Sequence, residues 1–273
     1  MIKLPKAVNS LKSQSFGRRV YCMESDDRKY WLKLQVAHIN SEYERSFLNE
    51  LEIYRQLSDF ESADDKILCN FSISNINGHF QSNYGQSGHY LNNELFLEQV
   101  LCVEHADALF AKSPFGITFI DVVEILQKSL DVLDHLHQLE FIHGDLKVEH
   151  FRYLNHRAAL IDLEQCCHIT SLSKMPNTAT PRYMAPELFH AESKSFATDV
   201  YALGVIWLEW LTQERFQQKN YLDWAKFHCQ SLKIELSIGF KPLDDVLILM
   251  LSKNKVHRCS NIYQLKQLLS QIV

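Results

Sequence analysis

Residues 199–211, DVYALGVIWLEWL, constrain the fold of this chain more than any other segment. An ordinary surface helix is apolar along one stripe, whereas this segment is apolar almost all round, which is typical of a helix buried on every side. It therefore predicts a core built around one central helix. With 273 residues and a hydrophobic content of 46%, the chain is large enough to enclose such a helix.

The chain changes its pattern at about Thr118. Before this point the sequence predicts one amphipathic helix and four strands, at residues 42–57 and at 19–23, 29–34, 67–73 and 95–100 respectively. Beyond it, helical patterns dominate. A strand-rich part joined to a helix-rich part predicts a bilobal α+β fold. We expect one domain with an N-lobe of about residues 1–99, a C-lobe of about residues 100–273, and a junction near Gln99–Ala106.

The densest group of reactive side chains lies in FIHGDLKVEHFRYLNHRAALIDLEQ, residues 141–165. Asp145 and Asp162 stand at the ends of short strand-like runs, where side chains can converge on one cleft, and Lys147 is near the first of them. Phosphoryl transfer needs such a set. One acid orients the attacking hydroxyl, another holds Mg²⁺, and the lysine offsets charge on the transferring group.

The order of these motifs resembles that of eukaryotic-type protein kinases over nearly the whole chain. HGDLKVEH is similar to the catalytic loop H-R-D-L-K-x-x-N, and LIDLE to the metal-binding D-F-G triplet. The resemblance implies that Asp145 is the catalytic base, that Lys147 contacts the γ-phosphate, and that Asp162 is the principal Mg²⁺ ligand. His150 takes the place of the metal-binding asparagine.

Two downstream motifs extend the resemblance. TPRYMAPE, residues 180–187, is similar to the end of an activation segment, which supports an extended peptide. DVYALG resembles the helix whose aspartate, here Asp199, holds the catalytic loop, and Arg258 is expected to pair with Glu187. Because Thr180 occupies the position usual in Ser/Thr enzymes, the resemblance implies transfer of the γ-phosphate of ATP to Ser or Thr hydroxyls of a protein.

The first half of the chain fits the same pattern. YWLKLQ resembles the strand that carries the ATP-anchoring lysine, which is Lys33. Its partner is expected to be Glu50, an acid on the apolar stripe of the next helix that needs a cation there, although Glu44 and Glu52 compete for this role. LFLEQV is expected to lead into the hinge, where Glu98–Val100 would present backbone groups to adenine.

Three departures from the family pattern bear on the chemistry. The glycine-rich phosphate loop is missing as a motif, since its region holds only Gly17, and we hypothesise that Arg18 and Arg19 supply charge instead. The arginine of H-R-D, which reads a phosphate on the activation segment in the family, is Gly144, so we expect activity without that phosphorylation. In D-L-E, Glu164 adds a carboxylate that holds a second metal ion or sits in the turn.

Two other functions stay open. Bacterial lipopolysaccharide-core kinases and other sugar or small-molecule kinases vary at these positions and often carry a histidine or an acid there, which fits His150 and D-L-E. A pseudokinase that acts as a scaffold fits the missing glycine loop. The retained charged set disfavours the pseudokinase, because unpaired buried acids cost stability. Imidazole is also a poorer partner than oxygen for a hard cation. His150 is therefore expected to be a metal-side ligand, a donor to phosphate or a structural residue.

Composition narrows the partners. A net charge of -5 argues against a dedicated nucleic-acid binder. The 7 cysteines include no C-x-x-C pair, which indicates free thiols in a reducing compartment. No apolar run is long enough for a signal peptide or a membrane span. We therefore expect a cytoplasmic protein that uses ATP with Mg²⁺ or Mn²⁺ and acts on a protein substrate.

Overall fold

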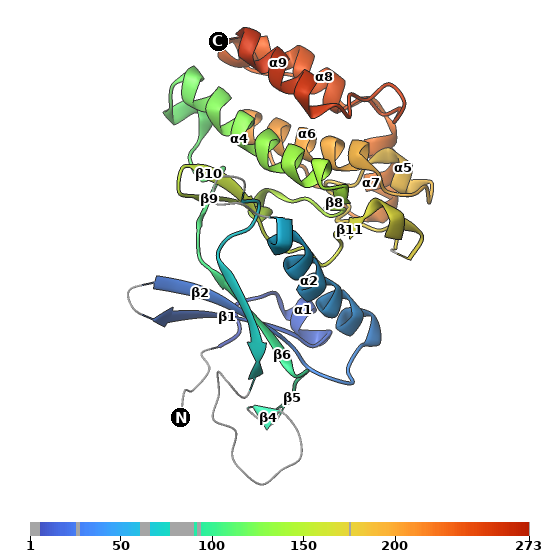
Figure 1. Cartoon of the computed structure of the whole chain (residues 1–273). Coiled ribbons are helices and arrows are strands. Elements are labelled where there is room, and N and C mark those ends of the chain that lie inside the picture. The colour runs from blue at the N-terminus through green and yellow to red at the C-terminus, as the bar shows by residue number, and fades with distance from the viewer. Residues whose placement is uncertain are drawn as a thin grey trace. The chain divides into compact units, whose positions relative to one another are not determined.

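The computed structural model describes residues 6–25, 28–60, 66–76, 90–91, 94–174 and 176–272. The chain forms two compact units, the first from residues 1–61 and 68–106 and the second from residues 62–67 and 107–273. Unit 1 is rich in strands and has one long helix, whereas unit 2 is mostly helical (Figure 1). The α+β class predicted from sequence is thus confirmed.

Unit 1 is built on an antiparallel four-stranded sheet with the strand order β1-β2-β6-β3. Its helices and strands are α1 (Leu11–Ser15), β1 (Arg18–Ser25), β2 (Arg28–Gln35), α2 (Ser41–Phe60), β3 (Phe71–Asn75), β4 (Tyr90–Leu91), β5 (Glu94–Leu95) and β6 (Gln99–Glu104). Apolar side chains on one side of the sheet form a core, made by Tyr21, Leu32, Leu34, Val36, Ile76, Phe96 and Val100.

Helix α2 begins with a side-chain cap and carries a buried apolar stripe. Asn40 Oδ1 accepts hydrogen bonds from the amides of Glu42 and Tyr43 at 3.0 and 3.1 Å, which satisfies two donors of the first turn. The spacing of three to four residues that predicted the stripe is confirmed, because Phe47 and Leu51 are both 0% exposed. The same face therefore carries Glu50 into the interior of unit 1.

Strand β6 lies later in the chain than the sequence indicates. The apolar run at residues 95–100 predicts a strand there, but β6 spans Gln99–Glu104, and its bonds to β2 continue as far as Glu104. As a central strand it stays in the sheet until its pairing ends. The chain leaves unit 1 only after Ala106, so residues 100–106 lie in unit 1 and not in the second part.

Unit 2 surrounds one buried helix. Its strands are β7 (Asp107–Ala108), β8 (Phe141–Ile142), β9 (Phe151–Leu154), β10 (Arg157–Leu160) and β11 (Cys167–His168). Its α-helices are α4 (Phe119–Gln138), α5 (Pro186–Phe189), α6 (Phe196–Thr212), α7 (Tyr221–Cys229), α8 (Asp244–Met250) and α9 (Ile262–Ile272). Short 3₁₀ helices are η1 (Pro114–Gly116), η2 (Val148–His150), η3 (Ile169–Lys174) and η4 (Ile238–Leu243).

Helix α6 is the central helix that its sequence predicts. Of its 17 residues, 14 are buried. It packs beside α4 (Figure 1), where Trp207 Nε1 donates a hydrogen bond of 3.0 Å to Ser129 Oγ. This bond satisfies the indole donor of a fully buried side chain. None of the helices in the described part of the chain combines the length and apolar content that a membrane span requires.

Two small sheets of unit 2 position its loops. One has the strand order β10-β9-β7, and the other pairs β11 with β8. Asn155 and His156, both with positive φ, make the tight turn between β9 and β10. The loop from β8 to β9 and the segment from β10 to β11 are therefore anchored at both ends by short strands. Asp145 and Lys147 lie on the first of them, and Asp162 and Glu164 lie on the second.

Candidate active site

Asp199 of α6 holds the loop between β8 and β9. Its carboxylate accepts hydrogen bonds from the amides of His143 and Gly144 at 2.8 and 2.9 Å. His137 Nε2 lies 3.1 Å from the same carboxylate. Burial raises the pKa of Asp199, but the hydrogen bonds from His137 and Gly144 outweigh it and lower the pKa. The carboxylate is thus ionised and fixes the loop backbone, which confirms the role expected for Asp199.

Asp145 is held by two neighbours that come from different segments. Lys147 Nζ lies 3.0 Å from Asp145 Oδ2, and the amide of Thr180 donates to Oδ1 at 2.6 Å. Burial lowers the pKa of Lys147, but the attraction of Asp145 and Asp162 outweighs it and raises the pKa, so the lysine is charged. The loop between β8 and β9 and the segment that contains Thr180 therefore meet at one oriented carboxylate.

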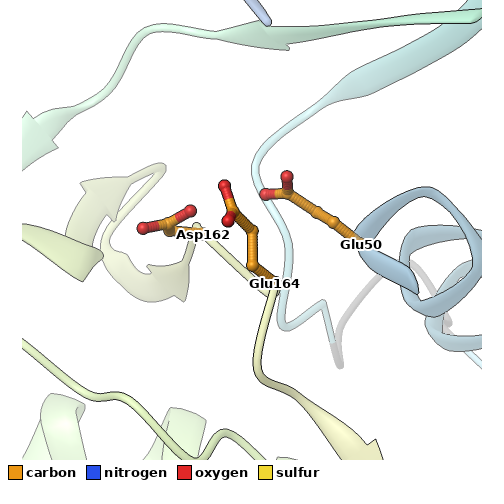
Figure 2. A group of neighbouring side chains, drawn as sticks. All are labelled: Glu50, Asp162 and Glu164. Atoms are coloured by element: carbon orange, nitrogen blue, oxygen red, sulfur yellow. The ribbon is translucent and has the colours of Figure 1, made fainter. Parts of the chain in front are cut away.

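Asp162 has two other candidate metal ligands of unit 2 close to it. His150 Nε2 is 3.1 Å from Asp162 Oδ2. Asp162 has a φ of 64°, in the left-handed region. Asp162 and Glu164 offer carboxylate oxygens within 4.8 Å of one another. Figure 2 shows these two acids on the segment after β10, and Glu50 projecting from α2. One imidazole and two carboxylates are a donor set that fits a divalent cation.

His150 is a buried residue with a second histidine beside it. Its exposed fraction is 3%, and its ring stacks on that of His143 with the centroids 5.4 Å apart. Burial, followed by repulsion from His150, lowers the pKa of His143 to about 4, so His143 is neutral at physiological pH. In the described part of the chain His150 Nδ1 has no hydrogen-bond partner. Its Nε2 is therefore the ring nitrogen turned to Asp162.

Lys33 and Glu50 form the expected ion pair in unit 1. Lys33 Nζ lies 2.8 Å from Glu50 Oε2 and donates to Oε1 at 3.0 Å. Of the competing acids, Glu44 bonds the backbone that precedes α2, and Glu52 bonds Gln56 on the surface. Since the carboxylate of Glu50 is 1% exposed, it needs a cation in the interior, and Lys33 supplies one.

Arg18 is a second cation on Glu50, which the sequence did not predict. Its Nη1 lies 3.6 Å from Glu50 Oε2, and its Nε donates to Gln35 Oε1 at 3.1 Å. Arg19 pairs with Glu94. Both arginines thus have partners within the chain, since Arg18 is 2% exposed and held inside unit 1 and Arg19 is engaged by a carboxylate. Their contact with a phosphate stays a prediction.

The region expected to hold a glycine-rich loop has another structure. Its residues LKSQS form the short helix α1, which Gly17 follows with a φ of 93°. A Cβ at Gly17 would lie 2.5 Å from Gln35 Nε2. The glycine thus lets the backbone approach the Gln35 side chain closely. This packing explains why residue 17 is a glycine without any contact with a phosphate.

The structure does not bring Glu98 and Val100 to the end of the sheet. The carbonyl of Glu98 accepts from the amide of Ile76 at 2.8 Å, and Val100 pairs with Ser74 inside the ladder and is 0% exposed. Their backbone groups are used within unit 1. A strand pattern predicts the existence of a strand better than its end, and here β6 ends four residues after Val100, at Glu104.

Arg258 and Glu187 form a buried ion pair in unit 2. Two guanidinium nitrogens donate to the two carboxylate oxygens at 2.8 and 2.9 Å. Burial raises the pKa of Glu187, but the hydrogen bonds from Arg258 outweigh it and lower the pKa. Thr198 Oγ1 also donates to Glu187 at 3.1 Å. The pair fastens the end of the activation segment to the helical core, and the expected partnership is confirmed.

Comparison with known proteins agrees with this geometry. The family described as "Protein kinase domain" matches residues 13–272, which is nearly the whole chain. The chain therefore belongs to the protein kinase family, whose members are phosphotransferases. The α+β architecture of the two units fits this membership.

Several curated kinases are similar to part of the chain. Myosin light chain kinase family member 4 of Homo sapiens is 29% identical over 116 residues, which are 39% of this chain and 30% of that protein. Myosin light chain kinase 3 of Homo sapiens is 32% identical over 96 residues, 34% of this chain and 12% of that protein. Mitogen-activated protein kinase kinase kinase mom-4 of Caenorhabditis elegans is 29% identical over 112 residues, which are 40% of this chain and 21% of that protein. Each match thus spans less than a third of the relative's length.

Proposed function

We propose that this protein transfers the γ-phosphate of ATP to Ser or Thr hydroxyls of another protein. The observation that carries the proposal is the orientation of Asp145, whose two oxygens are held by Lys147 at 3.0 Å and by the Thr180 amide at 2.6 Å. Because Thr180 opens the segment that supports a peptide in this family, the carboxylate is held by the element expected to carry the acceptor.

Each charged residue has a part in the proposed reaction. Asp145 accepts the proton of the acceptor hydroxyl, and Lys147 offsets charge on the phosphoryl group as it moves. Lys33, held by Glu50, is proposed to bind the phosphates of ATP. The proposed adenine contact shifts from Glu98–Val100 to the chain that follows β6, because Glu98 and Val100 already make backbone bonds within unit 1.

A divalent cation would be held by Asp162 with His150 and Glu164. When bound, it would supply Lewis-acid neutralisation of phosphate charge. The protein would supply the imidazole nitrogen of His150 and the carboxylates of Asp162 and Glu164. His150 Nε2 and Asp162 Oδ2 lie 3.1 Å apart. None of the 7 cysteines, all of which lie in the described part of the chain, forms a disulfide. This supports a reducing compartment, and we place the protein in the cytoplasm on that ground.

A phosphotransfer assay with ATP labelled at the γ-phosphate tests the proposal. Wild type, with Mg²⁺ or Mn²⁺ and a generic protein acceptor, is expected to label the acceptor or itself, at Ser and Thr. Lys33→Ala and Asp162→Ala are each expected to lower labelling by about 100-fold. An exposed-lysine variant, Lys253→Ala, serves as the matched control and should retain wild-type labelling.

A sugar or lipopolysaccharide-core acceptor is the second candidate, favoured by His150 and Glu164 in the metal-side positions. If wild type binds ATP with a rise in melting temperature but labels no protein, the acceptor class is wrong, and lipid-linked sugars are the next acceptors to assay. If ATP with either metal ion leaves the melting temperature unchanged, the chain is a scaffold and the proposed transfer is contradicted.

His150 is expected to make the site prefer Mn²⁺ over Mg²⁺. Imidazole is a softer donor than an amide oxygen, and Mg²⁺ is the more demanding of oxygen ligands. His150→Asn should therefore lower the ratio of Mn²⁺ to Mg²⁺ affinity by about 10-fold, measured in the presence of ATP by calorimetry and by the electron paramagnetic resonance of Mn²⁺. His156→Asn, on the turn after β9, is the control. An unchanged ratio would mean that His150 is only structural.

A further inference from the structure

Lys194 is a lysine in the interior of unit 2. It lies between α5 and α6 and is 2% exposed. Its Nζ donates a hydrogen bond of 3.1 Å to Gln165 Oε1, on the segment after β10. Within the described residues, no carboxylate lies at ion-pair distance from this ammonium. Because a buried charge without a counter-ion is costly, packing alone does not account for a lysine at this position.

The side chain of Lys194 fills the space next to Gly144. Gly144 has a φ of +77°, and a Cβ built on it would lie 3.0 Å from both Cδ and Nζ of Lys194. The same Cβ would lie 2.7 Å from the carbonyl oxygen of Gln165. A side chain at residue 144 would therefore displace the end of the Lys194 side chain and clash with the backbone of Gln165. The positive charge next to the catalytic loop comes from a residue 50 positions later in the chain.

The electrostatic surroundings of Lys194 point to the catalytic loop. Burial lowers its pKa, and the attraction of Asp145 and Asp199 opposes this effect. The neighbouring thiol of Cys166 is no counter-ion, because burial raises its pKa well above the ordinary value and keeps it protonated. The two acids that attract the Lys194 ammonium are thus Asp145, the proposed base, and Asp199, which anchors the loop of Asp145.

We propose that Lys194 replaces, in space, the arginine that the family carries at residue 144, and that it holds the catalytic loop against the segment after β10 without a phosphate. Lys194 is a positioning residue, since it acts through the orientation of Asp145. The inference rests on the proposed function, because that orientation matters only if Asp145 serves phosphoryl transfer. It also specifies the regulation, namely that no phosphate on the activation segment is needed.

Lys194→Met separates this role from packing. Methionine has a similar length and no charge, so removal of a costly buried charge should leave the melting temperature unchanged or higher. We expect the amides of residues 143–146 and 165–167 to exchange hydrogen faster than in wild type while α6 stays protected. We also expect kcat to fall by about 100-fold with the KM for ATP unchanged, because the base is misplaced. Lys253→Met, an exposed lysine, is the matched control.

Other outcomes overturn the inference. If Lys194→Met keeps wild-type kcat and wild-type exchange in both segments, Lys194 has no positioning role. If the variant unfolds, Lys194→Gln, which keeps a donor toward Gln165 without the charge, carries the same test, and retained kcat there contradicts the proposal. Loss of activity after phosphatase treatment of wild type contradicts the phosphate-free regulation. The exchange measurement needs no turnover, so a wild type without kinase activity would refute the proposed function and leave the placement of the loop testable.

Discussion

Asp145→Asn is expected to lower kcat for phosphoryl transfer by about 1,000-fold, the scale of a lost general base. Asparagine has the shape of aspartate and retains an oxygen that can accept from the Thr180 amide, but its amide cannot take up the proton of the acceptor hydroxyl. The loss should therefore appear in kcat, while the KM for ATP stays within about twofold. Steady-state kinetics with a protein acceptor measures both.

The folded state of the Asp145→Asn variant provides the control. Its melting temperature should lie within about 3 °C of the wild-type value, because the ion pair with Lys147 is partly exposed and contributes little. Asp107→Asn, at an exposed acid on β7, should change neither quantity. Wild-type turnover in Asp145→Asn would show that the base is another residue.

Arg258→Met is expected to lower the free energy of unfolding by about 3–5 kcal/mol, which is typical of a buried ion pair that loses one partner. Glu187 would remain, with its carboxylate 3% exposed and two of its hydrogen bonds gone. Urea unfolding monitored by circular dichroism measures the change. The double variant Arg258→Met/Glu187→Leu should recover part of the loss, because no unpaired charge is left.

The effect of Arg258→Met should depend on pH with a defined sign. The pKa of Glu187 in the folded wild type lies below its ordinary value of 4.5. The pair therefore contributes its full stability above the unfolded pKa and loses it as the pH falls through the folded pKa. The difference between wild type and variant should be largest at neutral pH and should shrink below about pH 4. A difference that is constant down to acid pH would contradict this assignment of the charge.

The sequence predicts best those parts of the site in which a buried charged side chain needs a partner of opposite charge. Glu50 lies on an apolar stripe, so it needs a cation, and Lys33 is the one that a strand delivers. The partnership of Arg258 with Glu187 is predicted from the resemblance to the kinase motifs alone. The central helix could be predicted because its composition leaves it no exposed face.

Other features could not be predicted, because they depend on which residues, far apart in the sequence, lie next to one another in the fold. Lys194 stands in a polar stretch that looks like an exposed loop, and only the fold shows that it lies beside Gly144. The end of β6 was misplaced because apolar runs on both sides of Gln99 are equally strand-like, and pairing with β2 decides where the strand ends. For the same reason, Val100 lies inside the sheet, and Glu98 precedes the first residue of β6 instead of following its last.

The second cation on Glu50 has a practical consequence. If a lysine were the only cation beside this glutamate, replacing the lysine would leave a buried acid without a counter-ion. The inactive variant would then also be less stable than wild type. Here Arg18 Nη1 remains 3.6 Å from the carboxylate when Lys33 is replaced. Lys33→Met should therefore give a stably folded protein without phosphotransfer activity. Such a variant is suited as bait for capturing the natural acceptor from a cell extract.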